Sequence, residues 1–244
     1  MRSRPTNCLT VDEVSFQYGR TLALDAVSFG VGNGRFCALL GPNGAGKSTL
    51  FSLMTRLLLP ASGRICVGGV NLAENPRRAL ARMGVVFQQP TLDLDLTVRR
   101  NLGYFAALQG ISGRSRERAI DRALDQLSMR ERAQERARDL NGGHRRRAEI
   151  ARALIHDPTV LLLDEPTVGL DAASRASITR HVHDLCAERG LCALWATHLV
   201  DEVRPEDDIV LLHRGKVLAA GRASAISGVR PLADAFLDLT GYAS

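Results

Sequence analysis

The most chemically specific segment of this 244-residue chain is a glycine-rich loop that fits the pattern GxxxxGK[ST]: Gly41-Pro42-Asn43-Gly44-Ala45-Gly46-Lys47-Ser48. In this pattern, glycines let backbone N–H groups turn inward around phosphate oxygens, and the start of the next helix adds a positive dipole end. Lys47 supplies a compact point charge for the β- and γ-phosphates, which the planar fork of arginine would not reproduce. The Ser48 hydroxyl is expected to bind Mg²⁺, and Thr49 is expected to be one of the nucleotide-binding residues. The segment predicts a nucleotide site.

A second chemical feature is a pair of acidic residues, Asp164 and Glu165, directly after the apolar run Leu161-Leu162-Leu163. Parallel α/β sheets bind ligands at the C-terminal edge of their strands, where these acids would lie. Asp164 is then expected to hold Mg²⁺ through water, and Glu165 to orient and polarise the attacking water. The alternative is a strand that ends in solvated acids. The phosphate loop in the same chain favours the catalytic interpretation.

These residues need a scaffold, and the apolar pattern predicts one. Short apolar runs predict four buried strands, at 36–40, 83–87, 160–163 and 191–196. The first of these strands leads into the glycine-rich loop. Helices are expected over 47–58 and 174–188, and the half-regular alternation of 9–16 predicts an edge or antiparallel strand. Hairpins are expected at two places: 63–72, and 208–221 with its turn at Arg214-Gly215.

The middle third of the chain, 97–155, has helical periodicity and no convincing strand. Within it, one face of 116–129 collects the apolar residues, opposite the charges: Ala119, Ile120, Ala123, Leu124 and Leu127. The pattern is an α/β core interrupted by a helical insertion. We expect a single domain over 1–244, with a core of 1–90 plus 157–244 and the insertion at 91–156.

Composition excludes several classes of protein. Lys+Arg 32 minus Asp+Glu 26 gives a net charge of +6, with 45% hydrophobic and 24% charged residues, which excludes a disordered or collagen-like chain. No aromatic residues interleave with the basic helix expected at 144–154, so a solvated basic face is the preferred interpretation and no nucleic-acid partner is expected. The five cysteines are scattered without a CxxC pair, which indicates reduced cytosol rather than zinc or disulfides.

The sequence also lacks the segments that would place it in or across a membrane. No apolar stretch follows the first residues, so no secretory signal is predicted. No run approaches the roughly 20 apolar residues that span a bilayer. If the protein acts at a membrane, another chain does the spanning.

With these motifs, the chain resembles the ATP-binding subunit of an ABC transporter over about residues 10–222. The resemblance implies a P-loop NTPase (RecA-like) core with an N-terminal antiparallel β subdomain and an α-helical insertion. Four further family landmarks occur in order: Tyr18 to stack on adenine, Gln88 to touch Mg²⁺ and bridge to the insertion, Asp171 in the loop that crosses to a partner subunit, and His198 to contact the γ-phosphate. The alternatives are a core tyrosine at position 18 and a structural histidine at position 198.

One landmark departs from the family pattern. The family signature is usually Leu-Ser-Gly-Gly-Gln, and this chain has Leu140-Asn141-Gly142-Gly143-His144. In the family this segment begins a helix and binds the γ-phosphate held by the other subunit. Gly142 and Gly143 keep backbone N–H groups accessible, Asn141 can donate from its amide, and His144 from a ring nitrogen. A working site is expected; the alternative is a half-site that has decayed.

The resemblance implies an ATPase with ATP and Mg²⁺ as cofactors, the metal being held by Ser48, Gln88 and Asp164. Because each motif occurs once, two chains must close the sites, as a homodimer or a heterodimer with a similar subunit. The dimer would power a separate membrane permease from the cytoplasmic face of the plasma membrane. The segment 88–102, which carries Leu92, Leu94, Leu96 and Val98, is the candidate coupling surface; the alternative is packing within the insertion.

Within the family, Arg145-Arg146-Arg147-Ala-Glu-Ile and Asp-Glu-Pro-Thr-Val-Gly-Leu-Asp are similar to the ABC-2 type export branch. The Asn-Gly-Gly-His variant, together with Thr91-Leu-Asp-Leu-Asp-Leu-Thr, is also similar to a subgroup associated with PQQ-dependent alcohol dehydrogenase systems. The alternative function is a soluble ABC ATPase of a cytosolic assembly process of the Fe–S cluster type. A coiled-coil DNA-maintenance ATPase is excluded because Lys47 and Asp164 are only 117 residues apart.

Overall fold

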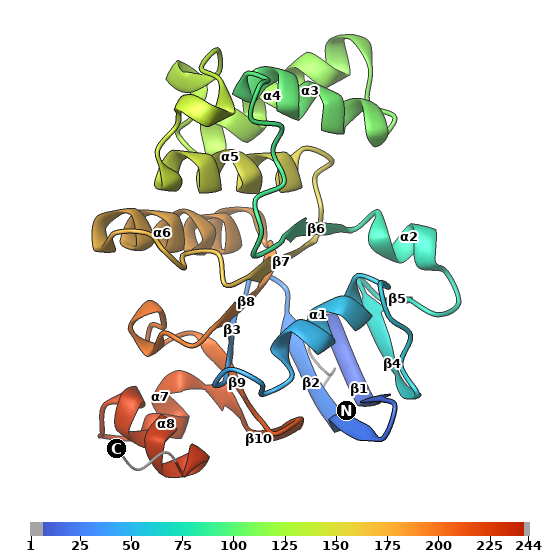
Figure 1. Cartoon of the computed structure of the whole chain (residues 1–244), viewed down its shortest axis with the longest axis vertical. Coiled ribbons are helices and arrows are strands. Elements are labelled where there is room, and N and C mark those ends of the chain that lie inside the picture. The colour runs from blue at the N-terminus through green and yellow to red at the C-terminus, as the bar shows by residue number, and fades with distance from the viewer. Residues whose placement is uncertain (1–6, 242–244) are drawn as a thin grey trace.

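The computed structural model describes residues 7–241, which form two sheets and the helices packed on them (Figure 1). The larger sheet has the order β10-β9-β3-β8-β7-β6. Its strands are β3 (Phe36–Leu40), β6 (Met83–Val86), β7 (Val160–Asp164), β8 (Cys192–Thr197), β9 (Asp208–His213) and β10 (Lys216–Arg222). The smaller, antiparallel sheet has the order β2-β1-β4-β5, made of β1 (Asn7–Tyr18), β2 (Thr21–Gly32), β4 (Ser62–Val67) and β5 (Val70–Asn71).

The centre of the larger sheet consists of parallel strands that are apolar on both faces. Every residue of β3, β7 and β8 is buried. In β3, Ala38 and Leu40 face one core, whereas Cys37 and Leu39 face the other, as the two-residue period of a strand requires. The buried strands predicted from apolar runs are therefore confirmed. Because β3, β8 and β7 are parallel neighbours, the residues that follow them meet at one edge of the sheet.

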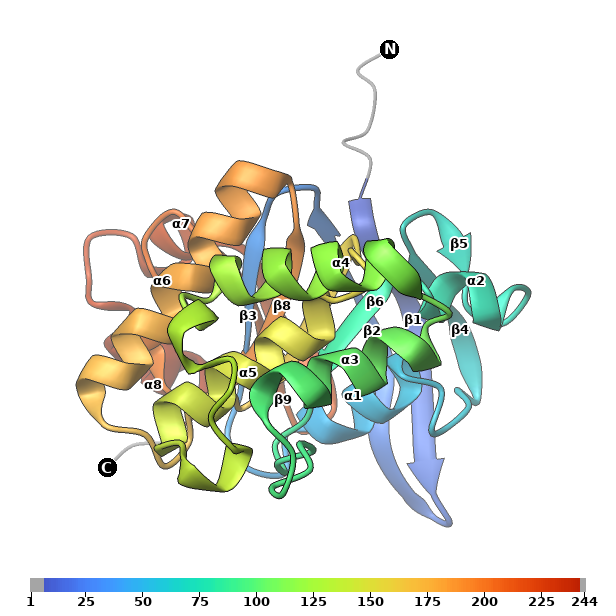
Figure 2. The same ribbon diagram turned by 90° about the horizontal axis from the view of Figure 1, so that it is seen from above.

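Helices cover one face of this sheet, and the antiparallel sheet with α1 covers the other. The helices are α1 (Lys47–Met54), α2 (Pro76–Leu80), α3 (Val98–Leu108), α4 (Gly113–Gln126), α5 (Gly142–Leu154), α6 (Ala172–Arg189), α7 (Ala223–Ser227) and α8 (Leu232–Thr240). Figure 1 shows α3, α4 and α5 at the end of the molecule opposite α7 and α8, and Figure 2, seen from that end, shows α3 and α4 in front of α5. The apolar face predicted for 116–129 is buried in this helical group. No helix of residues 7–241 is both long and apolar enough to cross a membrane.

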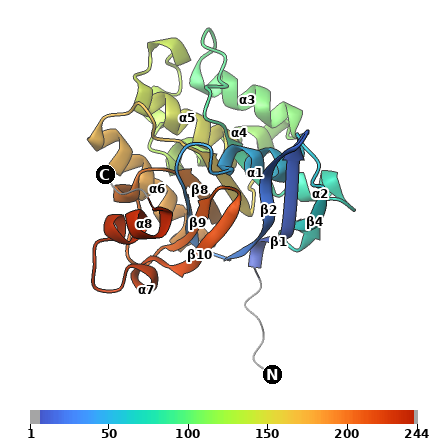
Figure 3. The ribbon, with the colours of Figure 1, turned by 60° about the horizontal axis from the view of Figure 1, so that its bottom comes forward.

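Several predicted boundaries were wrong. The strand predicted at 9–16 as an edge or antiparallel strand is antiparallel, but it lies inside its sheet between β2 and β4. Its partner β2 was not predicted, because register shifts and the positive φ of Glu13 (49°) and Ala26 (48°) interrupt the alternation of both strands. Helix α1 ends at Met54, four residues before the predicted end at position 58. Shortly after this end, Arg56 adopts a φ of 60°, which does not continue a helix. The C-terminal helices α7 and α8, visible in Figure 3, were also not predicted.

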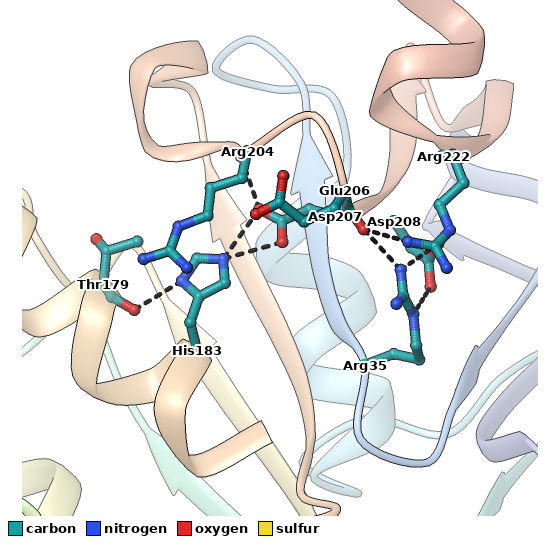
Figure 4. A network of polar contacts seen from close by, with 8 residues as sticks. All are labelled: Arg35, Thr179, His183, Arg204, Glu206, Asp207, Asp208 and Arg222. Atoms are coloured by element: carbon teal, nitrogen blue, oxygen red, sulfur yellow. Dashed lines mark hydrogen bonds and ion pairs between the residues drawn. The ribbon is translucent and has the colours of Figure 1, made fainter. Parts of the chain in front are cut away.

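A buried polar network joins α6 to the loop before β9 (Figure 4). The Nε2 atom of His183 lies 2.9 and 3.0 Å from the two carboxylate oxygens of Asp207, and its Nδ1 atom lies 2.8 Å from the Thr179 carbonyl oxygen. The imidazole ring of His183 also stacks on the Phe36 ring, with the two ring centroids 3.9 Å apart. Beside it, Arg35 donates to Asp208 at 2.9 Å and joins the starts of β3 and β9.

Replacing His183 with leucine is expected to lower the free energy of unfolding by about 3–5 kcal/mol, because the buried Asp207 carboxylate loses its hydrogen-bonded side-chain partner. Denaturant unfolding of the full chain measures this change. The double variant His183→Leu, Asp207→Asn should recover much of the loss because no unpaired buried charge remains. An equal loss in the single and double variants would contradict this account.

Candidate nucleotide site

A cleft of about 740 Å³ opens at the edge of the sheet where β3, β7 and β8 end. Its lining comes from β2, the glycine-rich loop and the loops after β6, β7, β8 and β9: Thr21, Leu22, Ala23, Pro42, Asn43, Gly44, Ala45, Gly46, Lys47, Ser48, Thr49, Gln88, Glu165, Val168, His198, Arg214 and Gly215. Helix α1 begins at Lys47 without any side chain capping its first turn. Its free N–H groups therefore face the cleft and can bind an anion.

Two glycines of the loop, Gly41 and Gly46, lie too close to neighbouring strands to carry a side chain. A Cβ on Gly41 would lie 2.4 Å from the Leu212 carbonyl oxygen on β9. A Cβ on Gly46, which has a φ of 111°, would lie 2.8 Å from the Leu24 side chain on β2. The loop is thus clamped between β2 and β9, and only glycine permits the approach at both points.

Lys47 lies in the centre of the loop and is 5% exposed. Its Nζ donates to the carbonyl oxygens of Gly41 at 2.6 Å and Pro42 at 3.2 Å, and it lies 3.6 Å from Glu165 Oε1. Burial lowers the pKa of the Lys47 ammonium, and the charges of Glu165 and Asp164 oppose that shift. The loop carbonyls hold the cation where the loop N–H groups converge.

The two acids occupy different environments at the end of β7. Asp164 is 8% exposed, and its pKa is raised by burial first and by the neighbouring Glu165 charge second. Glu165 has a φ of 45°, an uncommon backbone conformation outside glycine, and its N–H donates to the Ala196 carbonyl at 3.0 Å. This conformation brings Glu165 Oε1 to 3.4 Å from His198 Nδ1. Lys47, Glu165 and His198 therefore form one cluster in the cleft.

The proposed metal ligands are all oxygen donors. Ser48 and Gln88 line the cleft, and Asp164 lies directly before Glu165 on β7. Residues 7–241 contain no group of three or more His, Cys, Asp or Glu arranged to hold a metal. A few hard oxygen ligands fit Mg²⁺, which keeps several waters and takes other ligands from phosphates, better than a metal that needs a complete protein cage.

Tyr18 ends β1 opposite Thr21 of β2 and is 52% exposed, and it is not among the residues that line the cleft. Its ring contacts Phe16 edge-on, with the centroids 4.8 Å apart. Tyr18 is thus a surface residue, not a core tyrosine. The nearest part of the cleft wall is formed by Thr21 and Leu22 at the start of the next strand.

The signature residues lie outside the cleft, at the start of α5. The Asn141 side-chain oxygen accepts the His144 N–H at 2.9 Å, so Asn141 caps the helix. A Cβ on Gly143 would lie 2.7 Å from Ser174 Oγ, and one on Gly142 would lie 2.9 Å from the Leu170 side chain. The signature is therefore packed against the start of α6, in the same chain but apart from the phosphate loop.

Asp171 and His144 lie at the starts of neighbouring helices, α6 and α5. Asp171 caps α6, because its carboxylate accepts from the Ser174 N–H at 2.8 Å and the Ser174 hydroxyl at 2.7 Å. The pKa of His144 is lowered by burial first and then by the charges of Arg132 and Arg147. His144 therefore favours the neutral ring, which donates from one nitrogen only.

The arginines after the signature do not form the solvated basic face expected from the sequence. Arg146 is buried, pairs with Glu149 at 2.7 Å, and donates to the carbonyl oxygens of Phe87 at 2.9 Å and Gln88 at 3.1 Å. That prediction was wrong because these side chains satisfy backbone groups inside the protein. The Arg146–Glu149 pair connects the Gln88 segment to the helix that carries the signature.

The turn between β9 and β10 was not predicted to be part of the site. Gly215 donates its N–H to the Ala45 carbonyl at 2.9 Å and accepts the Asp25 N–H at 2.8 Å, so the turn is wedged between the phosphate loop and β2. This places Arg214 on the cleft wall, and it forms no ion pair within the described residues. The only signal in the sequence was the Arg-Gly turn itself, which has no bearing on phosphate binding until the hairpin is folded.

The segment 88–102 divides between core and surface. Leu92 and Val98 are buried in the helical core, whereas Leu94 is 44% exposed. Asn101 fixes the segment by donating to the Asp93 carbonyl at 2.9 Å. Packing within the insertion thus accounts for Leu92 and Val98, and Leu94 remains available at the surface.

Comparison with known proteins adds an independent result. Residues 24–168 match the family model described as ABC transporter. The chain is 39% identical over 220 residues to Nod factor export ATP-binding protein I of Neorhizobium galegae, covering 90% of this chain and 63% of that protein. It is 37% identical over 209 residues to the Escherichia coli protein named "Probable multidrug ABC transporter ATP-binding protein YbhF", covering 86% and 36%. The chain thus spans less than two thirds of the length of these two relatives.

Solved structures give the same result for the fold. The structure of cbiO1 from Clostridium perfringens, part of the ABC transporter complex cbiONQ, superimposes with a TM-score of 0.83 at 29% identity, covering 90% of both chains. The dimeric structure of MJ0796, a bacterial ABC transporter cassette, gives a TM-score of 0.76 at 26% identity, covering 88% of this chain and 98% of the other. These similarities confirm the predicted α/β class, a P-loop NTPase core with an antiparallel sheet and helical elements.

Proposed function

Since this chain belongs to the ABC transporter family as an ATP-binding subunit and ATPase, we propose that it closes two composite MgATP sites with a second subunit and powers a separate membrane permease, in the direction of export. One observation carries the proposal. The cleft contains Lys47, Glu165 and His198, while Asn141 and its neighbours lie outside it on α5. A second subunit must therefore supply the signature, as a homodimer or as a similar ATPase chain.

The side chains of the cleft have separate roles in hydrolysis. Lys47 and the loop N–H groups hold the β- and γ-phosphates, with Tyr18 stacked on adenine. Ser48, Gln88 and Asp164 hold Mg²⁺, which neutralises charge on the phosphates when bound. Glu165 orients and polarises the attacking water, and His198 donates to the γ-phosphate. The 3.4 Å separation of Glu165 and His198 supports their acting on the same phosphate group.

The partner subunit's contribution is the start of its α5. There the N–H groups of Gly142 and Gly143, with the Asn141 amide and one His144 nitrogen, face the γ-phosphate of the first subunit, and Asp171 lies in the crossing loop. We assign 91–156 to this helical signature subdomain and 1–90 plus 157–244 to the nucleotide-binding core of one ABC ATPase domain. Motion of the insertion reaches the permease through the 88–102 segment, with Leu94 at the contact.

The export direction is supported by the names of the relatives, Nod factor export and multidrug transport. The permease would hold this chain at the cytoplasmic face of the plasma membrane. Detergent-free extraction distinguishes this from a soluble assembly ATPase: recovery of the native protein free of membranes with soluble partners would overturn the exporter assignment.

Turnover of the purified chain tests the composite site. MgATP hydrolysis per chain is measured across a range of protein concentrations, with Glu165→Gln as the blank. Turnover that rises with concentration and disappears in the variant supports association of identical subunits. Turnover by a chain that size-exclusion chromatography with MgATP shows to be monomeric contradicts a composite site. Activity only on adding the permease or a second ATPase subunit would replace the homodimer by that assembly.

Replacing Asn141 with serine is expected to change turnover by less than about threefold, below 1 kcal/mol in the barrier. Serine keeps the oxygen that caps α5 and supplies a hydroxyl donor in place of the amide. Asn141→Ala, which removes both, is the matched comparison and should lose about 1 kcal/mol of stability with a larger loss of turnover. A large rise in turnover for Asn141→Ser would mean that the native signature is impaired.

Replacing Arg214 with alanine is expected to weaken ATP binding roughly 2- to 5-fold, as for an exposed charge pair. The charges of Lys47 and Glu165 offset each other in the cleft, which leaves Arg214 as the uncompensated cation of the lining. Lys216→Ala is the control, because Lys216 pairs with Asp25 at 3.0 Å and does not line the cleft. Titration with a fluorescent ATP analogue at two salt concentrations measures both; equal effects of the two substitutions would contradict a role for Arg214.

A further inference from the structure

Glu202 is a buried acid that the proposed mechanism does not use. It ends the 3₁₀ turn Val200–Glu202 after β8 and is 6% exposed. No Lys, Arg or His of residues 7–241 forms an ion pair with it. Burying a carboxylate without a cation is costly, and an apolar side chain at this point would avoid that cost. The hydrogen bonds that the carboxylate accepts must therefore offset this cost.

Both carboxylate oxygens of Glu202 accept hydrogen bonds from side chains of the catalytic segments. Trp195 Nε1 donates to Oε2 at 2.9 Å, and the Thr167 hydroxyl donates to Oε1. Thr167 lies two residues after Glu165, and Trp195 lies three residues before His198. One carboxylate thus connects the segment after Glu165 to the strand that leads to His198.

The two residues on either side of this bridge both depend on contacts from other segments. The His198 side chain is 40% exposed and lies in the loop after β8. Glu165 keeps a φ of 45°, which persists only when surrounding contacts hold it. Hydrogen bonds to a buried carboxylate are strong in a low-dielectric interior, so the bridge resists relative movement of the two segments.

We propose that Glu202 is a positioning residue for ATP hydrolysis, whose buried carboxylate keeps His198 and Glu165 at the separation the reaction needs. The proposal rests on the proposed function of the cleft and extends it to a residue that does not touch the nucleotide. Glutamine at this position preserves the bridge, since its oxygen accepts from Trp195 and its amide donates to the Thr167 hydroxyl. Alanine removes the bridge and leaves both partners unpaired.

Steady-state kinetics of the full chain test this assignment. Glu202→Ala is expected to lower kcat about 10- to 100-fold, the loss associated with misplacement of catalytic groups, with KM for ATP within about twofold. Glu202→Gln should retain most of kcat. In a His198→Ala background, Glu202→Ala should lower kcat by a smaller factor than in the wild-type chain, because one of the two groups that it positions is gone. An equal cost in both backgrounds would overturn the proposal and leave a purely structural role.

If Glu202→Ala fails to fold, Thr167→Val replaces it, because valine removes one donor with little change of shape. It should lower kcat in the same direction and to a smaller extent. Chemical unfolding of each variant shows whether the kinetic loss merely follows stability. A kcat unchanged in folded Thr167→Val and Glu202→Ala would contradict the proposal.

Trp195 is the only tryptophan of the chain, and its fluorescence gives a readout that does not depend on hydrolysis. Addition of MgATP to the catalytically blocked Glu165→Gln variant is expected to shift Trp195 emission through the bridge. The shift should disappear when Glu202→Ala is added and persist with Glu202→Gln. Binding of a fluorescent ATP analogue is measured on the same samples. Failure of the analogue to bind would reject the proposed function itself, whereas binding with a shift that Glu202→Ala leaves unchanged would reject only the bridge.

Discussion

Glu165→Gln is expected to lower ATP turnover by about 100- to 10,000-fold, the contribution of a general base, while ATP still binds. The side chain keeps its shape but no longer accepts a proton from water. Loss of the charge also lowers the pKa of Asp164, since Glu165 is one cause of its rise. Asp164 then stays ionised to lower pH and continues to bind Mg²⁺. Phosphate release measures turnover, and a fluorescent ATP analogue measures binding.

If the proposed composite sites form, the same variant should accumulate as an ATP-bound dimer, because in that proposal association needs nucleotide and separation needs hydrolysis. Size-exclusion chromatography with and without MgATP detects the change in mass. Turnover that persists in Glu165→Gln would show that another group is the base. Loss of ATP binding together with turnover would show instead that Glu165 supports the loop through Lys47, from which it is separated by 3.6 Å.

Lys47→Ala is expected to weaken ATP binding about 10- to 150-fold, since a charged hydrogen-bonding group contributes about 1.5–3 kcal/mol. The carbonyl oxygens of Gly41 and Pro42 would also lose their donor. Since burial lowers the pKa of Lys47 in the free protein, ATP affinity should fall with rising pH earlier than an ordinary lysine would dictate. Equilibrium titration of a nucleotide analogue across the alkaline range measures both effects.

The chain contains its own control for this experiment. Lys216 is the only other lysine, it is exposed, and Lys216→Ala should leave ATP affinity unchanged. Lys47→Arg should bind almost as weakly as the alanine variant, because a planar guanidinium does not fit between the two loop carbonyls. Wild-type affinity in Lys47→Arg would mean that the site needs only a positive charge and not a compact ammonium.

The elements predicted well from sequence are those with a strong local signal. The strands β3, β7 and β8 are buried on both faces, so nearly all their residues are apolar, and this continuous run is recognisable from the local sequence alone. The predicted helical face of α4 is likewise set by its own periodicity. β2 was missed because its bulged pairing with β1 is visible only when both strands are present.

The sequence by itself predicted which residues make up the candidate site. The glycine-rich loop, the Asp164-Glu165 pair and His198 are identified by residue type, spacing and family resemblance. These features are local, since a phosphate loop needs its glycines, lysine and hydroxyl consecutively along the chain. Residues 24–168, which match the family model, include the loop and both acids.

Only the tertiary structure decided how these parts face one another. It placed Glu165 beside His198, seated the Arg214 turn against Ala45, buried Arg146 against Gln88, and joined Thr167 to Trp195 through Glu202. Each of these contacts joins separate segments of the chain, and a hydrogen bond or ion pair of this kind depends on distances that only the packed sheet sets. The physical reason is the parallel sheet, which brings the ends of strands that are distant in sequence to one edge.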